Sequence, residues 1–336
     1  MGIQLTDLVE GKEIGLAALF DKRIAIDSFN WIYQFLSIIR QKDGTPLKDE
    51  KGRVTSHLSG LFYRTTKLIA AGIKPIYVFD GKMPEFKRAT TEQRRDIRAE
   101  AAHEWKEALT RGDLEAARKH AQRASELTEE MIRDSKLLLK ALGVPAIQAP
   151  SEGEALCSLM ARKGDAYAAA TQDYDSLLFG CPRVVRNLSI TGKRRRGKEL
   201  VSVEPTLILL KDVLENLGIG RSQLIILGIL VGTDYNPGGV SGYGPRKALE
   251  LVKKKKTLKA VLSEIVWDFD VPAEEIYDFF RKPLDVDYST EPGDVDEDAV
   301  KRLLCDEHDF SEERIESALQ KLKEERKSQK SLSKWL

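Results

Sequence analysis

The stretch RIAIDSF at residues 23–29 decides the fold. Its apolar residues alternate before the run ends on Asp27, which predicts a buried strand that closes on a carboxylate. A second run, PIYVFDG at 75–81, closes on Asp80, and a third, DAYAAATQDYD at 165–175, closes on two more aspartates. A single Asp after a strand is most often a turn or helix cap. Three strands that end in the same way point to a shared site.

Helical stretches separate these strands, including residues 58–71 and 133–142. The order β-α-β-α-β predicts an α/β protein with a mostly parallel central sheet flanked by helices. In such sheets ligands bind beyond the carboxyl ends of the strands. The acids are therefore expected at the edge where chemistry takes place.

Composition narrows the class of protein. With 336 residues, 42% hydrophobic and 32% charged, the chain fits one large globular α/β unit. No apolar run approaches the roughly 20 residues of a membrane helix. Cys157, Cys181 and Cys305 are too far apart for a disulfide framework or a paired metal motif, and no signal peptide is recognised. We therefore expect a reducing compartment and no membrane.

The net charge of +1 hides blocks of opposite sign. Residues 264–300 carry thirteen acids against two basic residues, so the rest of the chain is net basic. The basic surplus is clustered at 193–198 (KRRRGK), at 246–259 and after residue 325. Such blocks are compatible with solvated faces and equally with a polyanionic partner.

Two further regions depart from the βα rhythm. Residues 82–135 are polar, helix-forming and too poor in apolar residues for a core of their own, which predicts a helical excursion above the strand ends. After residue 175 we expect a loop that contains KRRRGK, then helices at 203–216 and 221–232. The segment GTDYNPGGVSGYGPRKALELVKKKK at 232–256 is typical of a helix, a glycine-rich turn and a second helix.

Seven acids are candidate ligands of a metal site. They are Asp27, Asp80, Glu152, Glu154, Asp173, Asp175 and Asp234. Carboxylates without interleaved His or Cys favour hard cations such as Mg²⁺ or Mn²⁺ over Zn²⁺. Without cations, mutual repulsion would leave such a cluster unstable or partly protonated.

Local alternatives remain open for three of these acids. Ser151 and Glu154 have the spacing of a helix capping box, and Glu152 would then favour the positive end of the helix dipole. Asp234 could cap a turn before Pro237. Capping alone and capping combined with metal binding are both compatible with the sequence.

Seven segments of the chain, in order, resemble one known family. They are MGIQ, AIDSFNWIYQFL, GIKPIYVFDGKMPEFK, APSEGEA, AAATQDYDSLLFG, GTDY…GYGPRKAL and DFSEERI. Together they resemble flap endonucleases of the structure-specific 5′ nuclease superfamily, in the archaeal form. The resemblance implies a PIN/5′-nuclease-like fold with one nuclease domain at 1–325, a helical arch at 82–135, a helix-hairpin-helix-type module at 221–256 and a flexible tail at 326–336.

The resemblance also implies an activity. Such enzymes hydrolyse a phosphodiester near the base of 5′ flaps, leave a 5′ phosphate, show 5′–3′ exonuclease activity, and act in Okazaki fragment maturation and base excision repair. By this resemblance, Asp27, Asp80, Glu152 and Glu154 would hold one Mg²⁺ or Mn²⁺, and Asp173, Asp175 and Asp234 would hold the other.

Further residues gain roles in the same way. Lys87 and Arg94 would neutralise the scissile phosphate, although with Arg98 they could equally form an ordinary exposed helix face. Tyr33 would stack on a base near the cut, although alone it would suit the core. Arg40 is a weaker candidate for contact with the same strand.

The N-terminus fits the family as well. MGIQLT also fits an N-myristoylation pattern, but the resemblance favours a free Gly2 amine near phosphate.

The remaining assignments concern DNA ends and partners. Gly242, Gly244, Arg246 and Lys247 would meet phosphates of the duplex, with K⁺ possible at backbone carbonyls nearby. One residue more than expected before Gly242 leaves those carbonyls unassigned. In the segment DFSEERI, Phe310 and Arg314 would select a one-nucleotide 3′ flap.

The C-terminus resembles a box that binds a PCNA-type sliding clamp. Its residues would be Gln329, Leu332, Trp335 and Leu336. We expect a monomer in the cytoplasm or nucleoid, or in the nucleus of a eukaryote. The alternatives are a Holliday-junction resolvase or 5′ exonuclease of the same superfamily, and a non-catalytic DNA-structure binder recruited to the clamp.

Overall fold

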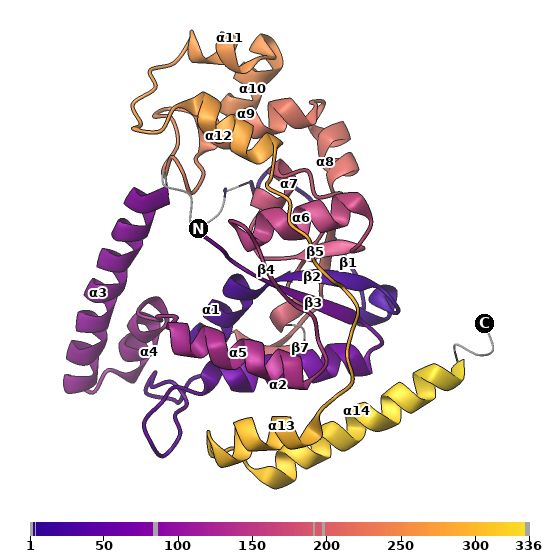
Figure 1. Cartoon of the computed structure of the whole chain (residues 1–336). Helices are drawn as coiled ribbons and strands as arrows, with labels where there is room; N and C mark the ends of the chain where they lie inside the picture. The colour runs from indigo at the N-terminus through magenta and orange to yellow at the C-terminus, as the bar shows by residue number, and fades with distance from the viewer. Residues whose placement is uncertain (1–2, 4, 83–86, 191, 197–198, 333–336) are drawn as a thin grey trace.

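The computed structural model describes residues 3, 5–82, 87–190, 192–196 and 199–332 (Figure 1). At its centre is a seven-stranded sheet with the order β1-β9-β6-β5-β2-β3-β4. The strands are β1 (Lys12–Glu13), β2 (Arg23–Asp27), β3 (Lys74–Phe79), β4 (Ala146–Gln148), β5 (Ala168–Ala170), β6 (Arg183–Arg186) and β9 (Thr206–Leu209). The five strands from β6 to β4 are parallel, and β9 and β1 add an antiparallel edge. The predicted mostly parallel sheet is confirmed.

Alternation along the strands divides the interior into two layers. In β2, Ile24 and Ile26 enter one apolar core while Ala25 enters the other, because successive side chains point to opposite faces of a sheet. The first core contains residues of α1 (Ser28–Ile38), α2 (Ser56–Ala70) and α5 (Glu129–Ala141). The second contains residues of α6 (Gly153–Lys163), α7 (Asp175–Leu178) and α9 (Arg221–Val231). Helices therefore cover both faces of the sheet.

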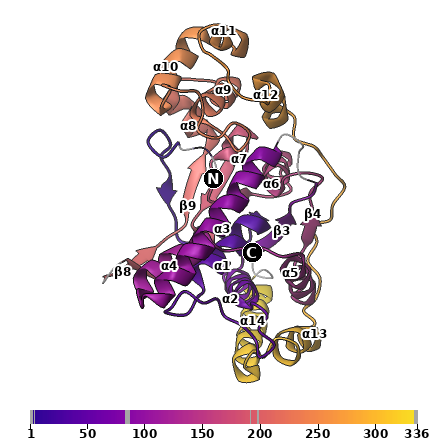
Figure 2. The same cartoon turned by 90° about the vertical axis from the view of Figure 1, so that its left-hand side faces the viewer.

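Two helices of the insertion lie beside the sheet. Helix α3 (Arg88–Thr110) runs along one side of the molecule and packs on α4 (Leu114–Arg123), as Figures 1 and 2 show. Their contact buries Ala101 and Ala108 of α3 and Ala117 and Ala121 of α4, and Glu104 of α3 pairs with His120 of α4 at 2.6 Å. Helix α5 begins at Glu129 and packs in the first core. The insertion predicted from the sequence, which ends at residue 135, therefore includes the start of a core helix.

The region after α7 corrects two predictions from the sequence. The KRRRGK segment, expected as a loop, contributes to a hairpin of β7 (Gly192–Arg196) and β8 (Glu199–Val203). The helix expected at 203–216 begins only at Leu210, with α8 (Leu210–Leu217), because residues 206–209 pair with β6 as strand β9. The runs ELVSV and TLIL are rich in β-branched and apolar residues, which favour such pairing.

The C-terminal third joins the two ends of the molecule. Helices α9, α10 (Pro245–Lys255), α11 (Leu258–Leu262) and α12 (Ala273–Arg281) gather at one end in Figures 1 and 2. At the other end lie α13 (Glu297–Lys301), the π-helical turn η4 (Arg302–Asp306) and α14 (Glu312–Leu332). Helix α14 therefore includes residues 326–332, which the sequence assigned to a flexible tail.

An extended segment, residues 282–296, runs between these two ends and contains much of the acidic block. It is fixed to the core by ion pairs of Asp285 with Lys163, at 2.5 Å, and of Glu291 with Arg23, at 2.8 Å. The backbone N–H of Gly293 also donates to the carbonyl of Gly143. Part of the acidic charge is therefore neutralised locally.

No single helix in the described ranges is long and apolar enough to cross a membrane. Helices α8 and α9 reach the required length and composition only as a pair bent by 79°.

Candidate active site

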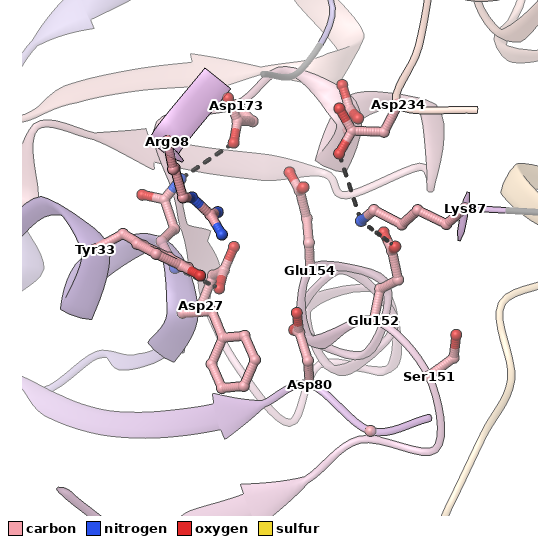
Figure 3. A pocket seen from close by; sticks show the side chains of 14 residues that line it. Asp27, Tyr33, Asp80, Lys87, Arg98, Ser151, Glu152, Glu154, Asp173 and Asp234 are labelled. Carbon is pink, nitrogen blue, oxygen red and sulfur yellow. Dashed lines mark hydrogen bonds and ion pairs between the residues drawn. The ribbon is translucent and has the colours of Figure 1, made fainter. Parts of the chain in front are cut away.

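All seven predicted acids line one cavity of about 320 Å³ (Figure 3). Asp27 ends β2, Asp80 follows β3, and Asp173 lies between β5 and α7. The other four stand at the beginning of α6, at the beginning of α7 and after α9: Glu152, Glu154, Asp175 and Asp234. The cavity lies at the carboxyl edge of the parallel strands, where the fold class predicts a ligand site.

The beginning of α6 resolves the capping alternative. Helix α6 starts at Gly153 with Glu152 at the N-cap, and no side-chain cap hydrogen bond is formed there. Instead, Asp80 Oδ1 accepts from the Gly153 N–H at 2.7 Å. The predicted capping box of Ser151 and Glu154 is therefore not formed, and Glu154 is available to the cavity.

Donor groups of three residues that the sequence analysis missed hold the acids in place. Both the N–H and the hydroxyl of Ser176 donate to Glu154 Oε1, at 2.8 and 2.7 Å. Asn30 donates from its Nδ2 to Asp173 Oδ2 at 3.1 Å and from its backbone N–H to Asp27 Oδ1 at 3.1 Å. The N–H of Ile3 donates to Asp175 Oδ1 at 2.8 Å. The site is thus preorganised by short-range and long-range contacts.

The electrostatics of the cavity penalise charge on the acids. Burial, followed by the charges of Asp173 and Asp234, raises the pKa of Asp175 to about 7. Burial, followed by the charge of Glu152, raises the pKa of Asp80 to about 6. The cluster therefore takes up protons or cations at neutral pH.

One cation of the chain itself enters this cluster. The Lys87 ammonium contacts Glu152 and lies 3.4 Å from Asp234 Oδ2 (Figure 3). It also lies 5.9 Å from the ring centre of Tyr235. Burial alone would lower the pKa of Lys87, but Glu152 and Asp234 outweigh it and raise that pKa. Lys87 is the N-cap residue of α3, so the insertion is anchored in the carboxylate cluster.

The donor set fits hard divalent cations because it offers only carboxylates. In the described parts of the chain, no three candidate ligands converge closely enough to enclose an ion. The Lys87 ammonium supplies positive charge between Glu152 and Asp234 in this arrangement.

The other residues predicted near the cut strand have different surroundings. Tyr33 lines the cavity, and the Arg98 guanidinium lies 5.1 Å from its ring centre. Arg40 donates to the carbonyls of Leu36 and Gly44 and to Ser125 Oγ, at 2.7 to 2.8 Å. Arg40 thus joins the end of α1 to Ser125, which follows α4 in the insertion. Gly2 and the side chain of Arg94 lie outside the described residues.

The glycine-rich turn is compact and leads into α10. Gly242 has a φ of +80°, in the left-handed region that favours glycine, and Gly244 is the N-cap of α10. Arg246 and Lys247 follow in the first turn of that helix. Backbone N–H groups and two basic side chains therefore stand at the positive end of the helix dipole.

The segment that carries Phe310 and Arg314 borders a second groove. Phe310 is partly buried against the core, whereas Arg314 lines a groove of about 870 Å³ between α2 and α14. Lys67 and Lys321 line the same groove and were missed, because nothing in the sequence brings α2 and α14 together. Thr66 and Tyr63 supply polar and aromatic surface there.

The predicted clamp box lies at the edge of what the structure describes. The backbone of Gln329 and Leu332 belongs to α14, whereas their side chains lie outside the described part. Trp335 and Leu336 lie wholly outside it.

Comparison with known families gives two matches, in different parts of the chain. Residues 1–101 match the XPG N-terminal domain, and residues 143–234 match the XPG I-region. Together the matched ranges contain all seven cavity acids.

Curated relatives match over the whole length. Flap endonuclease 1 of Pyrococcus abyssi is 56% identical over 100% of this chain and 98% of its own length. Flap endonuclease 1 of Pyrococcus furiosus is 54% identical over 100% of this chain and 99% of its own length.

Solved structures share the architecture. Flap endonuclease-1 from Methanococcus jannaschii superimposes with a TM-score of 0.77 at 42% identity, covering 98% of this chain and 100% of its own. The catalytic core of Rad2 in complex with DNA substrate has a TM-score of 0.71 at 27% identity, covering 96% of this chain and 100% of its own. From these matches and the carboxylate-lined cavity, the chain belongs to the flap endonuclease family of structure-specific nucleases.

Proposed function

We propose that this flap endonuclease cuts the phosphodiester near the base of a 5′ flap with two Mg²⁺ or Mn²⁺ ions held by its seven buried or half-buried acids. The observation that carries the proposal is the convergence of all seven acids in one cavity at the sheet edge. Asp27, Asp80, Glu152 and Glu154 would hold one ion, and the remaining three acids the other. Bound divalent ions supply hydroxide near neutral pH and offset charge on the scissile phosphate.

The chain's own residues place and neutralise the phosphate. Lys87 reaches the cluster from the N-terminus of α3, so its ammonium is positioned to exchange Glu152 and Asp234 for a phosphate oxygen. Arg94 would assist from the same helix. Tyr33 and Arg98 present an aromatic face and a guanidinium together, which suits stacking on an unpaired base.

The insertion suits the path of a single-stranded flap. Helix α3 starts beside the cavity, with Lys87 at its N-terminus, and runs away from it to α4. We infer that residues 82–135 form an arch through which the flap passes. The Arg40 guanidinium is hydrogen-bonded within the protein, so Arg40 would support the base of this arch and would not contact DNA.

Duplex DNA would be gripped at two places. The glycine-rich turn offers backbone N–H groups at Gly242 and Gly244 and the charges of Arg246 and Lys247, with K⁺ as a candidate ion at its carbonyls. A free Gly2 amine would be a second phosphate contact, as the resemblance to the family implies. Both contacts are with phosphate and would be independent of base sequence.

The groove between α2 and α14 would take the 3′ end of the upstream strand. Arg314, Lys67 and Lys321 supply positive charge there, and Thr66 supplies a hydroxyl. A one-nucleotide 3′ flap fits the chemistry of this groove, because its terminal phosphodiester meets cations. Phe310 would act by packing the segment against the core.

The C-terminal box would recruit a PCNA-type sliding clamp. Gln329, Leu332, Trp335 and Leu336 place an amide and three apolar side chains at the spacing of a single helical turn. We further propose that the protein works as a monomer on DNA in replication and repair, in the cytoplasm or nucleoid.

Cleavage of a double-flap DNA tests the proposal. With Mg²⁺ we expect incision one nucleotide inside the duplex and a 5′ phosphate on the product, and EDTA should abolish it. Cleavage of a four-way junction in preference to the flap would favour the resolvase alternative. Binding without any incision would favour a non-catalytic DNA binder.

A further inference from the structure

A second group of buried ionisable side chains lies outside the active-site cavity. The His308 ring stands between two buried carboxylates, with Nδ1 3.2 Å from Asp49 Oδ2 and Nε2 3.5 Å from Asp134 Oδ2. The Asp49 contact is a hydrogen bond, and the Asp134 contact is longer and lies on the opposite side of the ring. His308 is therefore a bridge between two parts of the chain.

Each of the two carboxylates also has an arginine partner. Arg53 Nε lies 2.7 Å from Asp49 Oδ2, and Arg133 Nε lies 3.3 Å from Asp134 Oδ1. Desolvation alone would raise the pKa of Asp49, but hydrogen bonds from Arg53 and His308 outweigh it and hold that pKa below its usual value. Burial lowers the pKa of the neighbouring His57 to about 3, so His57 adds no positive charge.

The bridge joins segments that are far apart in the sequence. Asp49 belongs to the loop 41–55, Asp134 to α5, and His308 to the turn 307–311 between η4 and α14. His57, in the first turn of α2, packs beside them. Four segments of the fold therefore meet at one imidazole.

Two further contacts fix the same turn. The N–H of Glu50 donates to Asp309 Oδ2 at 2.7 Å, and the Arg53 guanidinium donates to the carbonyl of Glu307. Asp309 has a φ of +57°, a left-handed conformation that is uncommon for a residue other than glycine. A turn of this kind persists when its surroundings determine it. Here the surroundings are the loop 41–55 and the His308 bridge.

The turn 307–311 leads directly into the wall of the 3′ groove. Helix α14 starts at Glu312, and Arg314 faces the groove six residues after His308. The opposite wall is α2, whose first turn contains His57. The buried network thus sets how the start of α14 stands relative to α2.

We propose that His308 is a positioning residue for selection of the DNA 3′ end. Through Asp49 and Asp134 it fixes the turn that presents Arg314 to the groove between α2 and α14. This inference rests on the proposed function of that groove. His308 itself does not touch DNA, and its effect is on the preference for a substrate with a 3′ flap.

The test compares two flap substrates that differ by one 3′ nucleotide. His308→Gln replaces the ring between the two carboxylates with a shorter amide, and Asp49→Asn weakens the same bridge from the other side. For both variants we expect the advantage of the 3′-flap substrate to fall about tenfold, mainly through KM. Cleavage of the substrate without the 3′ nucleotide should stay within about twofold of wild type. Thermal unfolding identifies any variant that fails to fold.

Two results would overturn the inference. Equal slowing of both substrates would mean that the network only stabilises the fold, and an unchanged preference would mean that His308 does not position the groove. Arg314→Ala separates the two proposals. If Arg314→Ala loses the preference while both bridge variants keep it, the His308 inference fails alone. If Arg314→Ala also keeps the preference, the groove proposal and this inference fail together.

Discussion

The Lys87 ammonium lies 3.4 Å from Asp234 Oδ2, so the N-cap residue of α3 forms an ion pair with an acid of the cavity. It contacts Glu152 at the same time. The pair links α3 with α6 and with the segment after α9. This arrangement places the positive charge of one side chain between two acids of the cluster, and we propose that the same group contacts the phosphate.

Lys87→Met should lower both cleavage and the stability of the metal-free protein. Cleavage of a saturating flap substrate should fall about 10² to 10³-fold, because a preorganised positive group near the scissile phosphate is lost. The melting temperature in EDTA should fall by several degrees, since two half-buried carboxylates lose their partner. Single-turnover kinetics and calorimetry measure the two effects.

Lys82→Met is the matched control, because Lys82 is exposed and five residues away along the chain. It should leave both quantities nearly unchanged. Equal effects of the two substitutions would argue that general charge, rather than the geometry of Lys87, is responsible.

Ser176→Ala should weaken metal binding through Glu154. The Ser176 hydroxyl donates to Glu154 Oε1 at 2.7 Å, and loss of such a support of a metal-binding carboxylate typically costs about 10 to 100-fold in affinity. A Mn²⁺ titration followed by electron paramagnetic resonance should show this loss in the absence of DNA. Ser263→Ala removes an exposed hydroxyl instead and should bind Mn²⁺ like wild type. An unaltered affinity in Ser176→Ala would show that the Ser176 hydroxyl does not support the site.

The metal-free protein should lose stability as the pH rises. The pKa of Asp175 is raised to about 7 and that of Asp80 to about 6, so the folded form holds protons that the unfolded form has released. Their stabilising effect is complete below pH 4 and is lost as the pH rises through 6 and 7. Calorimetry in EDTA should give a lower melting temperature at pH 8 than at pH 6. Saturating Mg²⁺ should reduce the difference, and Asp175→Asn should flatten it.

A melting temperature in EDTA that climbs steadily from pH 6 to pH 8 would contradict this electrostatic account. So would an identical pH dependence in wild type and Asp175→Asn.

Deleting residues 329–336 should separate catalysis from recruitment. Basal cleavage of a flap should be unaffected, because the described active site contains none of these residues. Stimulation by a cognate sliding clamp should disappear, and Trp335→Ala should remove most of it. Stimulation that survives the deletion would rule out this box as the docking element.

Much of the site was predictable because local patterns encode it. Asp27 and Asp80 follow apolar runs, and a parallel sheet brings the ends of such runs to one edge. Local patterns misled where pairing decided the outcome. The run at 206–209 became strand β9 because β6 offered it an edge, and no local signal predicts that partner.

The supporting contacts were beyond prediction for a related reason. Asn30 and Asp173 are 143 residues apart, and His308 and Asp49 are 259 residues apart. A single Asn, Ser or His forms no periodic pattern in the sequence, so nothing there predicts its distant partner. For the capping box, a local pattern was present but did not form. The carboxylate of Glu154, which the pattern assigns to a helix cap, accepts from Ser176 instead.

Cleavage of a double-flap DNA by Asp175→Asn in saturating Mg²⁺ tests the central claim most directly. Asp175 lines the cavity, and the substitution keeps its shape while removing the charge that a divalent ion needs. Asp287→Asn, in the exposed acidic segment, is the control for a lost negative charge. We predict that Asp175→Asn cuts at least about 10³-fold more slowly than wild type while Asp287→Asn cuts normally. Cleavage by Asp175→Asn at the wild-type rate would contradict the assignment of the cluster as the metal-dependent catalytic centre.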